Sequence, residues 1–120
     1  MIRGVRGAIT VRENEEAEIV AATEKLLKQI VFENQIEPDM VASVFISVTE
    51  EITAAFPAKA IRLLEGWTLV PVMCMREIPV PGSLKNCIRV MMHVNTILEQ
   101  GEITHIYLDG AEGLRPDILK

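Results

Sequence analysis

The segment Cys87–Val94 constrains the fold of this chain most, because purely apolar side chains alternate in it with a set that includes Arg89 and His93. At the two-residue period of a β-strand, every second residue from Ile88 to Val94 is apolar, which predicts that this face packs on the core. The opposite face carries Arg89 in its middle. Burying a guanidinium without a partner costs several kcal/mol, so Arg89 needs an anion, either a carboxylate of the protein or a bound ligand.

The composition predicts one folded domain over residues 1–120. Of the 120 residues 49% are apolar, but only three are Phe, one is Tyr and one is Trp, so the core is expected to be aliphatic. The uncharged run Val41–Thr49 is far too short to span a bilayer, and Arg3 and Arg6 are not followed by the apolar segment of a secretion signal. We therefore expect a cytoplasmic protein that does not bind a membrane.

The charged residues favour a small anion over a polyanion. The formal net charge is −5, and residues 13–51 hold ten acidic residues against Lys25 and Lys28. The bases in the rest of the chain are scattered singly, without the basic stripe that nucleic-acid binding needs. The two Cys and two His lack the spacing of metal ligands or of a CxxC motif, so neither a zinc site nor a structural disulfide is expected.

Hydrophobic periodicity and breaker residues predict the order of secondary-structure elements. Strands are predicted at Ile2–Val11, Val41–Val48, Trp67–Met75 with an interruption at Pro71, Cys87–Val94 and Thr104–Leu108, and helices from a cap at Asn14 to about Asn34 and from Pro57 to Leu64. This order predicts an α/β (α+β) domain with a single mixed β-sheet of about five strands and two helices on one side. The other face of the sheet then lacks a cover, so association through the sheet is expected.

Several cations besides Arg89 are candidates for one anion site. Arg6 lies inside the first predicted strand, Lys59 and Arg62 share one face of the short helix, and Arg115 lies in the tail. Converging cations of this kind suit a dicarboxylate, because arginine binds a carboxylate through two parallel hydrogen bonds. The chain contains no GxSxG, Walker, HExxH or GxGxxG motif in the context that those motifs require.

Seven short blocks, distributed along the whole chain, carry a family resemblance. They are Ile2–Ala8, Phe56–Ala60, Val70–Val72, Cys74–Met75, Cys87–Met92, Tyr107–Leu108 and Leu114–Asp117. Together they closely resemble the small monofunctional AroH-type chorismate mutases. The resemblance implies a cytoplasmic homotrimer, in which three sheets form a pseudo-α/β barrel with an active site in each subunit cleft. It also implies the rearrangement of chorismate to prephenate on the route to phenylalanine and tyrosine, a Claisen step that needs no metal, cofactor or covalent intermediate.

The resemblance also implies roles for individual residues. Arg89 would donate hydrogen bonds to the ether oxygen, where negative charge grows as the C–O bond breaks. Arg6 would bind a substrate carboxylate and hold the compact reactive conformer. Glu77 and Cys74 match positions that contact the ring hydroxyl, and Tyr107 matches a position near the side-chain carboxylate. The residues that would form the walls of the cleft and close it are Phe56, Ala58, Lys59, Arg62, Leu114 and Arg115. Met73 stands where the resemblance leads us to expect a small hydroxylated residue.

Some features leave alternatives open. Strict alternation puts Cys74 and Glu77 on opposite faces of the sheet, unless the chain bulges near Arg76. Taken alone, Cys74 is typical of a small buried residue and Glu77 of a carboxylate that neutralises Arg89. Residues 111–120 are expected to form a mobile tail. Two other functions remain possible from the sequence: a non-catalytic trimer that binds a small carboxylate, and a trimeric hydrolase of the imine-deaminase type.

Overall fold

A five-stranded mixed sheet forms the centre of the protein. The computed structural model describes residues 1–114. The strands are β1 (Ile2–Thr10), β2 (Val41–Val48), β3 (Val72–Arg76), β4 (Cys87–Asn95) and β5 (Ile106–Tyr107), in the sheet order β3-β2-β4-β1-β5. The central strand β4 pairs antiparallel with β1 and β2, while β3 and β5 add parallel to β2 and β1 at the two edges. The mixed sheet predicted from the sequence is thereby confirmed.

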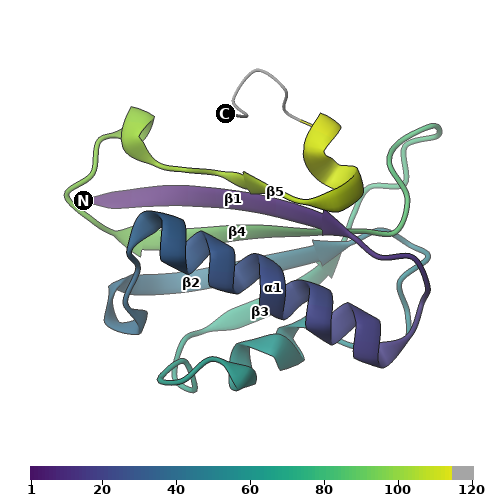
Figure 1. The fold of residues 1–120 in the computed structure, drawn as a ribbon, viewed down its shortest axis with the longest axis horizontal. Coiled ribbons are helices and arrows are strands. Elements are labelled where there is room, and N and C mark those ends of the chain that lie inside the picture. Colours follow the sequence, from purple (N-terminus) through teal and green to yellow (C-terminus); the bar gives the residue numbers. More distant parts are fainter. Residues whose placement is uncertain (115–120) are drawn as a thin grey trace.

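Two helical elements cover one face of this sheet (Figure 1). They are α1 (Glu16–Asn34) and the 3-10 helix η2 (Pro57–Leu63). Fully buried residues of α1, among them Leu26, Leu27 and Ile30, belong to one core with the apolar face of β4. The predicted division of β4 into a core face and a polar face is therefore correct. Three shorter 3-10 turns complete the described chain: η1 (Pro38–Met40), η3 (Gln100–Glu102) and η4 (Asp109–Gly113).

The other face of the sheet, which carries Arg89, has little cover in a single copy. We call it the open face. Large apolar side chains on it remain exposed, including Phe45 at 37%, Met73 at 59% and Met75 at 43%. One corner of this face is covered by η4, through a small cluster of Ala8, Cys87, Tyr107 and Ala111 against which Leu84 also packs. An apolar surface of this kind is typical of a protein interface.

Three predictions about individual elements are wrong. The long helix is capped by Glu15 and not by Asn14, whose side-chain oxygen instead accepts the backbone N–H groups of Thr53 and Ala54 at 3.0 and 2.9 Å. The short helix is a 3-10 helix. The third strand begins only after Pro71, because the N–H of Val70 turns back to the carbonyl of Trp67 at 3.0 Å and leaves the ladder.

Two further observations concern absences within the described residues. No helix in residues 1–114 is long and apolar enough to cross a membrane. The same residues contain no group of three His, Cys, Asp or Glu side chains that could hold a metal ion. Both cysteines, Cys74 and Cys87, are free thiols.

Candidate active site

Arg89 lies at the centre of the open face, on the middle strand of the sheet. In the strand register it stands beside Ala8 of β1 and Ser47 of β2. Its Nε lies 3.3 Å from Oε2 of Glu77, and Ser47 Oγ donates a hydrogen bond of 2.7 Å to the same oxygen. The Arg89 contact is an ion pair without hydrogen-bond geometry, so the buried Nε is left without an acceptor. Among residues 1–114 it is the one buried side-chain donor in this condition.

A cavity of about 470 Å³ opens beside Arg89, and we call it the arginine pocket. Four of the residues predicted for the site line it: Arg6, Arg89, Tyr107 and Leu114. Its remaining walls are Gly7, Ala8, Phe45, Ser47, Met75, Val90 and Met91. The pocket thus combines two guanidinium groups, a phenol and an apolar wall. Such a combination fits a small anionic ligand with an apolar ring.

A second cavity lies at the β3 edge of the sheet, where the loop before η2 runs past the start of α1. We call it the Phe56 pocket. Its volume is about 570 Å³, and it contains three more predicted residues, namely Phe56, Lys59 and Cys74. Thr53, Ala54, Ala55 and Glu16 also line it. Glu16 forms an ion pair with Lys59, which places a negative charge next to this cation.

The two cavities meet at β3 and share Met75, but Cys74 lines only the Phe56 pocket. The β2–β3 register runs without a shift from the pair Val44–Val72 to the pair Val48–Arg76. Side chains therefore keep alternating, so Cys74 points toward the α1 side while Met75 points to the open face. The chain makes no bulge near Arg76, and Glu77 reaches Arg89 on the open face. The bulge that would bring Cys74 and Glu77 to one substrate within a single copy is therefore not present in β3.

Four described residues predicted for the site line neither cavity: Glu77, Ala58, Arg62 and Met73. Ala58 is half-buried in η2, and Arg62 is exposed on the same helix. Met73 stands beside Phe45 on the open face but lines neither pocket. Arg115 lies outside the described residues, as does most of the predicted mobile tail. In the described start of that tail, Ala111 is fully buried.

Burial determines the state of the two thiols. It raises the pKa of the Cys74 thiol, although the backbone of Ala58 partly offsets this effect. Burial also raises the pKa of Cys87, which lies next to Arg89 on the open face and is partly compensated by that cation. A thiol with a raised pKa is neutral at neutral pH and is a poor nucleophile. Cys74 is therefore suited to polar contact and not to covalent attack.

Sequence reasoning missed several residues of these cavities. Ser47 and Phe45 alternate with buried residues in β2, and this period alone could have placed them on the face of Arg89. Glu16 could not be found in this way, because its partner Lys59 is 43 residues away.

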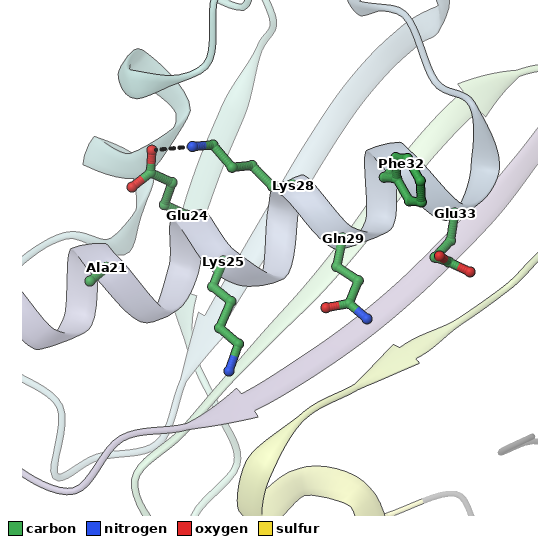
Figure 2. A pocket seen from close by; sticks show the side chains of 7 residues that line it. All are labelled: Ala21, Glu24, Lys25, Lys28, Gln29, Phe32 and Glu33. Carbon is green, nitrogen blue, oxygen red and sulfur yellow. Dashed lines mark ion pairs between the residues drawn. The ribbon is translucent and has the colours of Figure 1, made fainter.

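A third hollow lies on the exposed side of α1 and is shown in Figure 2. Lys28 and Glu24 form an ion pair of 3.0 Å across one turn of the helix, and Phe32 is 78% exposed near its C-terminal end. Such i,i+4 pairs are ordinary on a solvated helix face. None of the predicted site residues lines this hollow.

Comparisons with known proteins agree with the residue blocks. Residues 2–118 match the family model described as chorismate mutase type I. The chain is 50% identical over 118 residues to chorismate mutase AroH of Bacillus subtilis (strain 168), spanning 98% of this chain and 93% of the relative. It is 45% identical over 119 residues to chorismate mutase AroH of Thermus thermophilus, spanning 98% and 97%. A solved chorismate mutase from Clostridium thermocellum matches with a TM-score of 0.89 and 52% identity, over 92% of this chain and 97% of that one.

Proposed function

Because this chain belongs to the type I chorismate mutase family, we propose that it rearranges chorismate to prephenate at a site to which two neighbouring subunits contribute. Its activity is that of a chorismate mutase, an isomerase of aromatic amino acid biosynthesis. Neither a non-catalytic carboxylate-binding trimer nor an imine-deaminase-like hydrolase agrees with a family match over residues 2–118.

One observation supports the arginine pocket as the place of reaction. The Nε of Arg89 is a buried, charged donor without an acceptor, and it faces a cavity that also contains Arg6. In the rearrangement the ether C–O bond breaks ahead of C–C bond formation, so negative charge grows on the ether oxygen. A fixed donor aimed at that oxygen stabilises the transition state more than the bound substrate. In this assignment Arg89 donates a hydrogen bond from Nε to the ether oxygen.

Other residues of the pocket bind and orient the substrate. Arg6 pairs with one substrate carboxylate and helps hold the conformer in which the two carbons can meet. Glu77 does not line the pocket itself; held by Ser47 beside Arg89, it accepts the hydrogen bond of the ring hydroxyl. Tyr107 and Leu114 form the wall on the side of β5 and η4. No residue forms a covalent bond to the substrate or transfers a proton in this scheme.

The site is completed by a second copy of the chain. Cys74 and Glu77 point to opposite sides of one sheet, so both can reach a single substrate when they come from different copies. The exposed apolar side chains of the open face support such an association. We propose a cytoplasmic homotrimer in which the Phe56 pocket of one subunit, with Lys59 and Cys74, meets the arginine pocket of the next. Ala58, Arg62, Met73 and Arg115 are assigned to the same cleft by the family resemblance alone.

The test measures the loss of chorismate by ultraviolet absorbance, with purified protein and no added metal or cofactor, and identifies prephenate as the product. The wild-type chain is expected to turn over chorismate, and Arg89→Lys to lower kcat about 100-fold or more, because lysine cannot reproduce the planar donor geometry. Arg12→Lys is the control, since Arg12 is exposed and lines neither pocket. Chorismate loss at only the spontaneous rate would contradict the activity. Full kcat in Arg89→Lys would contradict the role of Arg89.

A further inference from the structure

We propose that Thr10 is a positioning residue for this reaction, because its hydroxyl fixes the turn that delivers Leu114 to the arginine pocket. The inference rests on the proposed function, since it concerns the same site. Thr10 itself does not line the pocket. It acts through a contact with Gly110, which lies 100 residues further along the chain.

The contact between Thr10 and Gly110 is close and specific. Thr10 is the last residue of β1, and its Oγ1 accepts the backbone N–H of Gly110 at 2.9 Å. A Cβ added at Gly110 would lie 2.7 Å from that Oγ1 and 3.1 Å from the Thr10 methyl group. Atoms do not approach so closely without moving, so a glycine is needed at position 110 for this contact to form. Figure 1 shows η4 beside this end of β1.

Besides Thr10, the turn is anchored by an ion pair, by the packing of Ala111, and by the N–H of Leu108, which bonds to the carbonyl of Ala8 at 2.9 Å. Asp109 begins η4 with a left-handed backbone (φ 54°), and its carboxylate lies 3.8 Å from Nζ of Lys25 on α1. Both side chains of that ion pair are about half exposed, so it contributes little. Within η4 the buried methyl group of Ala111 packs near Tyr107. The Thr10 hydroxyl therefore supplies a directional contact at the start of the turn.

The end of the same turn forms part of the site. The N–H of Ala111 bonds to the carbonyl of Leu108 at 3.0 Å, and the N–H of Leu114 bonds to the carbonyl of Ala111 at 3.1 Å. These two bonds transmit the position of residues 108–111 to Leu114, which lines the arginine pocket beside Arg89. If the start of η4 loosens, the apolar wall that excludes water from the bound substrate loosens with it. Arg89, Arg6 and Glu77 keep their places, because they belong to other elements.

This geometry predicts a separation of the kinetic constants. Thr10→Val keeps the shape of the side chain but removes the acceptor, so KM is expected to rise about two- to tenfold, the usual worth of one such hydrogen bond. The value of kcat is expected to stay within about twofold, since the group that stabilises the transition state is untouched. Thr10→Ser keeps the hydroxyl and is expected to restore the wild-type KM. A purely structural threonine would lower the unfolding temperature without this pattern.

Steady-state kinetics on the full chain test the inference, at a temperature well below the unfolding midpoint of each variant. Thr96→Val is the matched control, because the Thr96 hydroxyl also accepts a backbone N–H, that of Leu98 at 3.2 Å. Thr96 lies just before the turn η3 and lines neither pocket. Gly110→Ala disrupts the Thr10 contact from the other side and leaves β1 unchanged. The double variant Thr10→Val with Gly110→Ala is expected to raise KM by less than the product of the two single effects, because both substitutions remove the same contact.

The outcomes separate this inference from the proposed function. A KM that rises in Thr10→Val and Gly110→Ala but not in Thr10→Ser or Thr96→Val supports the positioning role. A wild-type KM in both Thr10→Val and Gly110→Ala, in an enzyme that turns over chorismate, overturns it. Equal loss of kcat in the two variants also overturns it, since Thr10 would then act on the transition state. If the wild-type chain does not turn over chorismate, the proposed function fails instead.

Discussion

Two impaired variants of this chain are expected to recover activity when their subunits are mixed. The first variant, Arg89→Ala, damages the arginine pocket. The second, Phe56→Ala with Lys59→Ala, damages the Phe56 pocket. The prediction rests on the proposed two-subunit site, in which Cys74 of β3 faces the α1 side while Glu77, just after β3, pairs with Arg89 on the open face. One active site then needs one pocket from each of two subunits.

The magnitudes follow from the groups removed. Loss of a charged donor aimed at the developing charge lowers kcat about 100- to 1,000-fold. Loss of a hydrogen bond from a charged lysine costs about 1.5–3 kcal/mol, or about 10- to 100-fold in kcat/KM. In a random equal mixture, about a quarter of the sites receive an intact pocket from each side, because each site draws its two halves from different copies. The mixture should therefore recover about a quarter of the wild-type activity.

The assay mixes the variants under mild denaturant, removes the denaturant and follows chorismate loss, while native mass measurements verify mixed oligomers. Arg89→Ala mixed with Arg6→Ala is the matched control, because both lesions lie in the arginine pocket. In that mixture every site retains one lesion, so no recovery is expected. If the Arg89 and Phe56–Lys59 mixture forms mixed oligomers but recovers no more activity than the control, each site lies within one subunit and the two-subunit proposal is refuted.

Two further predictions concern charge in and near the pockets. Glu16→Gln removes the carboxylate that pairs with Lys59, so KM is expected to fall about two- to fivefold, the usual range for an exposed ion pair. Glu15→Gln is the control, because it changes the net charge equally but lies outside the pocket, and it should leave KM unchanged. Burial raises the pKa of Cys87 in the folded protein, so folding stability should fall as the pH rises from the ordinary pKa of a thiol to the raised value. In denaturant unfolding at a series of alkaline pH values, Cys87→Ala should show a smaller fall; an identical fall would assign the pH dependence to other groups.

The sequence predicted best what depends on short-range periodicity. The alternation around Arg89 placed this residue and the core face of β4 correctly, because a strand has a period of two whatever its neighbours are. The same rule separated Cys74 from Glu77, and this separation now supports a site shared between subunits. Residue blocks distributed over the chain then identified the family.

The sequence failed where the partner of a side chain lies far along the chain. Asn14 is a good helix cap by residue type, but its carbonyl oxygen meets the backbone N–H groups of Thr53 and Ala54 and is used there. The ion pair of Glu16 with Lys59 and the contact of Thr10 with Gly110 span 43 and 100 residues. Such contacts arise only from the tertiary arrangement, so no local pattern could reveal them.

The contact between Ser47 and Glu77 explains how Arg89 can keep a nearby carboxylate and still serve a ligand. Ser47 Oγ donates to the same Glu77 oxygen that lies 3.3 Å from Arg89 Nε. With its oxygen held by Ser47, Glu77 neutralises part of the arginine charge but does not give Nε a well-aligned acceptor. The resting pair thus lowers the cost of keeping a guanidinium half-buried, while Arg89 Nε keeps no hydrogen-bonded acceptor and is free for the ether oxygen that the proposed mechanism assigns to it.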